Sequence, residues 1–434
     1  MKRVQTILLG VALLALLPLS AAAQPPDTAD ALFNDGVLHE IRLAVNSKDW
    51  QFLKDHVLDD THYPADFRWN DKVVRNVSIK SHGAGSRRPN KPSLKVGFNH
   101  YTTGQTFLGL QSILLRNNSQ DQTNMHERLS MLLFRRLGLA AQREVHTRLF
   151  VNEEYVGLYT ICEEYDTDFL QKNLGENTGH LYEYKFDDQA AFAGQPPFSF
   201  QYLGPDPALY VPSPFEPKTL ENDPQGEVIA RFVQAVSDTG AAAWRTMVSQ
   251  YLDLEKFIRY LAVENFLAEE DGLTGDYGPN NFYLYRLANT TTFRFLPWDK
   301  SNTFWDAPSP DYSIFRNVQD GWEDHRNLLV LRAFQEPDLL DLYLRTLLDA
   351  ADSASSLAAA SPDDPPFDQG WLEREVNREY DQIHDAALAD TILFSNDDFE
   401  QGAAALKVFA RDRSGAVRAQ VAPASRALDQ ALGR

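Results

Sequence analysis

The order of the apolar patterns along the chain is the feature that most restricts its fold. Between residues 38 and 98, apolar residues alternate with polar ones, as in strands that bury one face. Beyond residue 225, apolar residues recur at helical spacing, and a single strand pair, 281–287 and 293–296, interrupts the helical part. Strands first and helices second, with one embedded hairpin, predict a two-lobed α+β fold.

Local signals predict several individual elements. Asn124 followed by Glu127 resembles a capping box that starts a helix, and Gly138 is placed to end it. A hairpin is expected from residues 147–151 and 156–161. Proline, glycine and acidic residues in 194–224 predict a linker between the lobes. Further helices are predicted over residues 228–236, 254–267, 339–350 and 371–388, with a surface loop over 351–366.

The first residues are typical of an export signal. Lys2 and Arg3 precede an apolar run at residues 7–19 and small residues at 20–23, so cleavage is expected before Gln24. The run is too short to favour a permanent membrane span, although an uncleaved anchor is the alternative. We therefore expect a bacterial, exported protein, periplasmic or extracellular, with no membrane span after cleavage of residues 1–23.

Charge and cysteine content exclude several classes of function. The formal net charge is −20, so the surface repels phosphate backbones and we expect no nucleic-acid partner. An ATP site on such a chain must concentrate its positive charges locally or use metal ions. The single cysteine, Cys162, excludes a disulfide framework and multi-cysteine metal sites, and its apolar surroundings predict an inert core residue. The histidines show no zinc-hydrolase spacing.

The segment from Asp271 to Asp299 holds the acids that best fit phosphoryl transfer. Asp271 and Asp276 precede the first strand of the predicted hairpin, Asn281 begins that strand, and Asp299 follows the second strand. In kinases, one carboxylate orients the attacking hydroxyl, while an amide and a second carboxylate hold the metal ions. Asp276 precedes Asn281 by the five residues found in ordinary kinases. A turn with Asx hydrogen bonds is the alternative interpretation.

A basic segment is the second candidate site. A glycine-containing turn at residues 82–91 is followed by a predicted strand, whose period of two places Lys91, Ser93 and Lys95 on one side. In so acidic a chain, this concentration of positive charge favours a phosphate-binding surface over a solvated edge strand. The predicted phosphate-binding residues are Lys80, Arg87, Arg88, Lys91, Ser93 and Lys95.

Two glutamates are further candidates. Glu127 lies on the first helix after the basic strand, where kinases keep the glutamate that positions their lysine, or it serves only the capping box. Glu163 follows the hairpin and lines the nucleotide cleft or faces water.

Together these stretches resemble the spore coat protein H (CotH) kinase family, over about residues 38–421. The family-like stretches are residues 63–71, 77–86, 91–95, 114–138, 151–163, 280–285, 297–299 and 409–417. The sequence departs from the family at Ser301, where the family usually has a second acid, at Pro92, which replaces a lysine, and at Lys80 and Ala84.

The resemblance implies an atypical kinase fold that uses ATP and Mg²⁺ or Mn²⁺ to phosphorylate serine or threonine of a protein. The implied domain has an N-lobe at about 38–193, a linker at 194–224 and a C-lobe at 225–421, between short tails at 24–37 and 422–434. Asn281 and Asp299 are the expected metal ligands, with Lys91 or Lys95 as the phosphate lysine. Asp271 or Asp276 is the expected catalytic aspartate. A non-catalytic binding protein of the same family is the rival interpretation.

Overall fold

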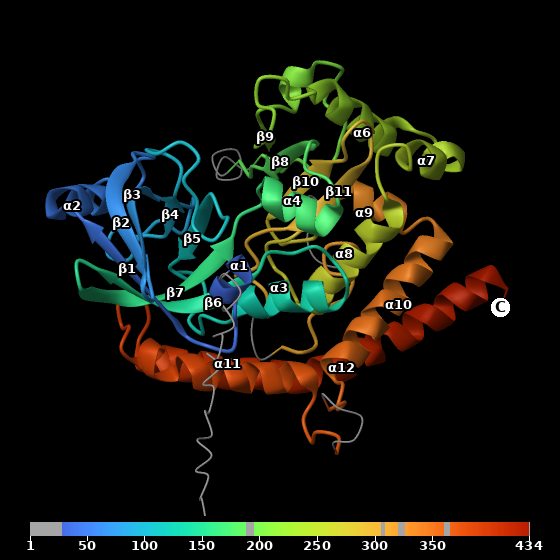
Figure 1. The fold of residues 1–434 in the computed structure, drawn as a ribbon. Coiled ribbons are helices and arrows are strands. Elements are labelled where there is room, and N and C mark those ends of the chain that lie inside the picture. Colours follow the sequence, from blue (N-terminus) through green and yellow to red (C-terminus); the bar gives the residue numbers. More distant parts are fainter. Residues whose placement is uncertain (1–27, 188–194, 305–308, 320–325, 360–364, 434) are drawn as a thin grey trace, which may run out of the picture.

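The computed structural model describes residues 28–187, 195–304, 309–319, 326–359 and 365–433 (Figure 1). The predicted signal peptide, residues 1–23, lies outside these ranges. Strands and helices are both abundant, so the predicted α+β class is confirmed. Within the described ranges, none of the helices combines the length and apolar character needed to cross a bilayer.

The strand-rich half is a closed barrel of seven strands in the order β1-β2-β3-β4-β5-β7-β6. Neighbouring strands run antiparallel except β1 and β6, which pair in parallel and close the barrel. The strands are β1 (His39–Val45), β2 (Tyr63–Trp69), β3 (Lys72–Ser81), β4 (Leu94–Gly97), β5 (Ser112–Arg116), β6 (Glu144–Val151) and β7 (Glu154–Glu163). The apolar patterns predict strands within residues 38–98 and the β6–β7 hairpin, but they predict neither β5 nor the closure. The closure depends on β1 pairing with a strand far along the chain.

The barrel interior is filled by the apolar face of that alternation. In β1 and β2 every second residue is buried. Phe67 meets Phe98 and Phe107 edge-on, with ring centroids 5.2 and 4.9 Å apart. Aromatic edges against faces pack more favourably than stacked sandwiches, so these rings fix the barrel core.

The helical half is built on a second sheet with the strand order β11-β10-β8-β9. The predicted hairpin is present as β10 (Phe282–Arg286) and β11 (Phe293–Pro297), while β8 (His180–Tyr184) and β9 (Phe215–Pro217) precede it in the chain. The expected linker at 194–224 differs from the structure, because it contributes β9 and the fully buried Phe200 and Tyr210. The segment therefore packs on the core of the helical half through its aromatic residues.

Helices cover this sheet, and α11 runs beneath the barrel towards α12 (Figure 1). The helices predicted from periodicity are present as α6, α8, α10 and α11. The helices are α1 (Ala29–Leu32), α2 (Ser47–Asp55), α3 (His126–Arg136), α4 (Thr167–Leu174), α6 (Gly226–Asp238), α7 (Ala241–Val248), α8 (Leu254–Phe266), α9 (Leu328–Ala333), α10 (Pro337–Ala354), α11 (Trp371–Leu388) and α12 (Asn396–Leu432), with a 3-10 turn η1 (Pro207–Leu209).

The start of α3 differs from the predicted capping box. Asn124 has a left-handed backbone, with φ of 60°. Helix α3 begins after Met125, which makes no side-chain cap. Asp121 takes that role, because its Oδ2 accepts the amide of His126 at 2.8 Å. The capping-box prediction was wrong, and Glu127 is therefore available for other contacts. Gly138, with φ 77°, follows the helix as predicted.

Candidate active site

The hairpin β10–β11 brings Asn281 and Asp299 to the same end of the sheet. Phe282 pairs with Pro297, so the residues just before β10 and just after β11 are neighbours. The amide of Trp298 donates to the carbonyl of Asn281 at 3.2 Å. Asn281 and Asp299 both have left-handed backbones, with φ of 56° and 47°. Such backbones cluster at functional sites, where the surrounding structure holds them.

Asp271 lies against this pair. Its carboxylate accepts hydrogen bonds from Nδ2 of Asn280 at 3.1 Å and Nδ2 of Asn281 at 3.0 Å. Burial raises the pKa of Asp271 to about 6, the charge of Asp299 adds to the rise, and the amide donors oppose it. A carboxylate with this pKa is a stronger base than an exposed aspartate and is still largely ionised at neutral pH.

Asp276 has a different environment. Nε and Nη2 of Arg316 lie 2.7 and 2.5 Å from its two carboxylate oxygens, and Nδ2 of Asn317 donates at 2.8 Å. Burial alone would raise the pKa of Asp276, but these hydrogen bonds hold it below its ordinary value. The structure therefore places Asp271 in contact with Asn281, while Asp276 is engaged in a bidentate ion pair.

Arg116, at the end of β5, joins the barrel to this site. Its Nη1 lies 2.9 Å from Oδ1 of Asp299, and its Nε lies 3.3 Å from Oε2 of Glu127 on α3. The guanidinium also covers the ring of Trp298, 4.5 Å from the centroid. Sequence reasoning did not identify Arg116. The available signal was a lone charge directly after the buried run 112–115.

Three of the predicted phosphate-binding cations, Lys80, Arg87 and Lys95, lie around His82 on the same side of the barrel as Arg116. Burial, together with the positive charges of Arg116, Lys95, Lys80 and Arg87, holds the pKa of His82 well below its ordinary value. The His82 ring lies 6.4 Å from that of Trp298. The cations around His82 are therefore near the turn that carries Asp299.

Each of these cations has an acidic partner. Nζ of Lys95 lies 2.6 Å from Glu164, Nη2 of Arg87 lies 2.8 Å from Asp60, and Nζ of Lys80 lies 3.6 Å from the same aspartate. The Asp60 side chain is 65% exposed, so its ion pairs are weak and a phosphate can replace it as partner. We define this group, Lys80, Arg87 and Lys95, as the cation group.

Lys91 has a structural environment instead. Its Nζ lies 2.6 Å from Oδ2 of Asp390, and both side chains are at most 4% exposed. The ammonium also lies 5.2 Å from the centroid of Tyr159. Lys91 thus joins the barrel to the segment that follows α11, and its charge is already neutralised there.

The remaining predicted residues have specific partners. Ser93 is buried, and its Oγ accepts the amide of Asn117 at 3.0 Å. Nη1 of Arg88 donates to the carbonyl of Gly85 at 2.8 Å. Glu163 is 4% exposed and receives Nε of Arg143 at 2.9 Å, so its carboxylate holds that arginine beside the hairpin.

The donor set fits a hard divalent cation. Within the described ranges, Oδ1 of Asn281 and Oδ2 of Asp299 accept no hydrogen bond, although the other polar atom of each side chain is engaged. An amide oxygen and a carboxylate oxygen on adjacent turns are ligands that Mg²⁺ and Mn²⁺ prefer. These two residues can therefore hold the metal that the sequence predicted.

Comparisons with known proteins identify the family of the chain. The family model described as "CotH kinase protein" matches residues 79–417, which is more than half of the chain. The chain is similar to "Inner spore coat protein H" of Bacillus subtilis (strain 168), with 26% identity over 272 residues, covering 62% of this chain and 70% of that protein.

Two more distant similarities concern a fungal protein and a solved structure. "Invasin CotH3" of Rhizopus delemar is 24% identical over 268 residues, covering 56% of this chain and 40% of that protein. The crystal structure of the Helicobacter pylori proinflammatory kinase CtkA matches 79% of this chain and 96% of its own, with 11% identity and a TM-score of 0.28.

Proposed function

Because the chain belongs to the CotH kinase protein family, we propose that it is a protein kinase that transfers phosphate from ATP to serine or threonine hydroxyls. The observation that carries the proposal is the hydrogen bond between Asn281 and Asp271, which lies beside Asp299. Arg116, from the barrel, forms an ion pair with Asp299. In this proposal the barrel acts as the N-lobe, and the helical half acts as the C-lobe, of an atypical bilobal kinase.

Each residue of the site has a distinct proposed role. Asp271 accepts the proton of the attacking hydroxyl, and its amide donors hold the carboxylate in place. Asn281 and Asp299 hold Mg²⁺ or Mn²⁺, which when bound neutralises charge on the phosphates. Arg116 and the cation group bind phosphate oxygens, which supplies the local positive charge that this acidic chain otherwise lacks.

Ser301, which stands where the family usually has a second acid, supports the same arrangement. Its Oγ donates to Oδ1 of Asp299 at 3.0 Å, on the oxygen that also receives Arg116. With both donors on Oδ1, the other oxygen, Oδ2, would be available to a metal ion. We therefore propose that one protein carboxylate is sufficient for metal binding here.

We further propose that the protein acts outside the cytoplasm on an envelope or extracellular protein. The two named relatives are a spore coat protein and an invasin, and both names imply a surface location for those proteins. The export signal predicted at residues 1–23 is consistent with that location. The acceptor would then be a protein exposed in the same compartment.

The direct test is phosphate transfer from labelled ATP. We expect the purified chain, supplied with Mn²⁺ or Mg²⁺, to label itself or an acceptor protein, and Asp299→Ala to lose the label. Asp349→Asn is the matched control, because Asp349 is an exposed acid on α10. Equal labelling by wild type and Asp299→Ala, or no labelling by either, would contradict the proposed activity and favour a non-catalytic binding protein.

A further inference from the structure

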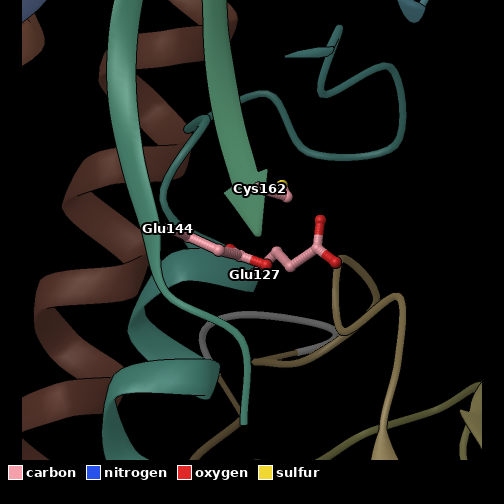
Figure 2. Close-up of side chains that lie close together, drawn as sticks. All are labelled: Glu127, Glu144 and Cys162. Carbon is pink, nitrogen blue, oxygen red and sulfur yellow. The ribbon is translucent and has the colours of Figure 1, made fainter. Parts of the chain in front are cut away.

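A buried cluster behind Arg116 provides none of the catalytic, metal-binding or phosphate-binding groups proposed above. Glu144 begins β6, Cys162 lies directly opposite it on β7, and Glu127 approaches from α3 (Figure 2). One potential ligand atom from each residue lies within 4.8 Å of the other two. All three residues are buried, with exposed fractions of 5% for Glu127, 1% for Glu144 and 0% for Cys162.

The carboxylates of this cluster have fewer partners than buried acids normally have. Within the described ranges, the Cys162 thiol is the hydrogen-bond partner of the Glu144 carboxylate, and Oε1 of Glu127 accepts no hydrogen bond. Buried polar groups in folded proteins are nearly always paired, and an orphaned carboxylate calls for a ligand that completes it. Arg116 approaches Oε2 of Glu127 only, and it is shared with Asp299.

From these contacts we infer that Glu127, Glu144 and Cys162 form a binding site for a thiophilic divalent cation, of which Zn²⁺ fits best. The combination of a thiolate with two carboxylates favours Zn²⁺ over Mg²⁺ and Ca²⁺, which take oxygen ligands only. The site is distinct from the pair Asn281 and Asp299, which offers oxygen donors alone, and it does not depend on the proposed kinase activity.

The distances allow such a site after a small closure. Zinc bonds of about 2.0–2.3 Å place tetrahedral ligand atoms roughly 3.3–3.7 Å apart. The three ligand atoms already lie within 4.8 Å of one another, so the side chains need close by no more than about 1.5 Å. The second oxygen of Glu144 or a water molecule would occupy the fourth coordination position of the Zn²⁺ ion. Binding releases the thiol proton of Cys162, and any carboxyl proton, to solvent.

The ionisation of the empty cluster agrees with this geometry. Burial raises the pKa of Cys162 well above its ordinary value, and burial also raises that of Glu144 to about 7, against the opposing charges of Arg116 and Arg135. Without a cation, protons therefore neutralise part of the cluster. A bound cation would replace them and hold Glu127 in position beside Arg116.

Cobalt substitution tests the inference without any measurement of activity. The full chain is stripped with a chelator and titrated with Co²⁺ alone. We expect one equivalent to produce a near-ultraviolet band of thiolate-to-cobalt charge transfer, and Zn²⁺ to displace it. Cys162→Ser should abolish the band, and Glu144→Gln should weaken Co²⁺ binding by about 10-fold or more.

Asp299→Ala separates this site from the proposed nucleotide metal, because it should keep the charge-transfer band while it loses ATP-linked metal binding. A folded wild-type chain that shows no band, or a Cys162→Ser variant that keeps it, would overturn the inference. The wild-type titration decides the question even if Cys162→Ser fails to fold. Loss of kinase activity with the band retained would count against the proposed function only.

Discussion

The barrel and the helical half meet at two junctions. Each junction contains an ion pair between a basic and an acidic side chain, but the two junctions have different roles. At the front junction, Arg116 and Asp299 are 12% and 25% exposed, and Oδ2 of Asp299 is unpaired within the described ranges. At the rear junction, Lys91 and Asp390 are at most 4% exposed, and Asp390 also accepts the amide of Leu158 at 2.8 Å. The front junction has a carboxylate oxygen without a partner and can bind a ligand. The rear junction is buried and its carboxylate is already paired, so it holds the two halves together.

The rear junction continues along α11. Nη1 of Arg128 lies 2.9 Å from Oε2 of Glu379, and both side chains are at most 1% exposed. Nδ1 of His146 lies 3.4 Å from the other carboxylate oxygen of Glu379. Breaking one member of such a buried group leaves an uncompensated charge, so the rear junction should control stability while the front junction controls function.

The largest effect is expected at the front junction and concerns Asp271 and Asp276. The sequence alone did not decide which of the two is the catalytic aspartate. Asp271→Asn should lower kcat by about 10³-fold, because it removes the proposed base but keeps the hydrogen-bonded shape. Asp276→Asn should leave kcat within a few fold and lower the melting temperature, because it weakens the pair with Arg316. Steady-state kinetics and thermal denaturation measure the two effects. The reverse pattern would assign catalysis to Asp276.

At the rear, Lys91→Met should lower the free energy of unfolding by about 3–5 kcal/mol, because Asp390 is then buried without a counter-charge. Urea denaturation measures the loss, and the double variant Lys91→Met/Asp390→Leu should recover much of it. Folded Lys91→Met protein should still bind ATP. If ATP binding vanished while the fold persisted, Lys91 would belong to the front.

The residues at the front and rear junctions show which features the sequence can predict and which it cannot. Alternation and helical spacing predict β10, β11 and α11 because those signals are local. The partner of Lys91 lies about 300 residues away, so neither its burial nor its neutralised charge has a local signal. Arg116 had a weak local signal, a lone charge after the buried run 112–115, but its partner Asp299 is also distant in the sequence. Asp271 and Asp276 share one loop, and only packing against Arg316 and Asn281 distinguishes them.

A smaller effect should appear in the pH dependence of the rear junction. Burial raises the pKa of Glu379 from 4.5 to about 7, against the charge of Arg128. Its stabilising contribution is therefore complete below about pH 4.5 and is lost as the pH rises through 7. Relative to Glu379→Gln, the free energy of unfolding of the wild type should fall by about 2–3 kcal/mol over that range. Parallel pH curves from urea denaturation would show that Glu379 is not buried as described.

The smallest expected effect concerns the cation group. Lys95→Met should raise the KM for ATP about 10-fold, which corresponds to one lost charge-assisted phosphate contact. Its melting temperature should change little, since the Lys95–Glu164 pair is partly exposed, with Lys95 at 32%. Lys48→Met is the matched control, because Lys48 is an exposed lysine of α2. Equal KM values for the two variants would remove Lys95 from the phosphate site.

A crystal structure with a non-hydrolysable ATP analogue and Mn²⁺ would show directly whether Asn281 and Asp299 form the metal site. We expect an anomalous manganese peak bonded to Oδ1 of Asn281 and Oδ2 of Asp299, with phosphate oxygens near Arg116. A manganese peak away from both side chains, or triphosphate density beside Lys91, would contradict it.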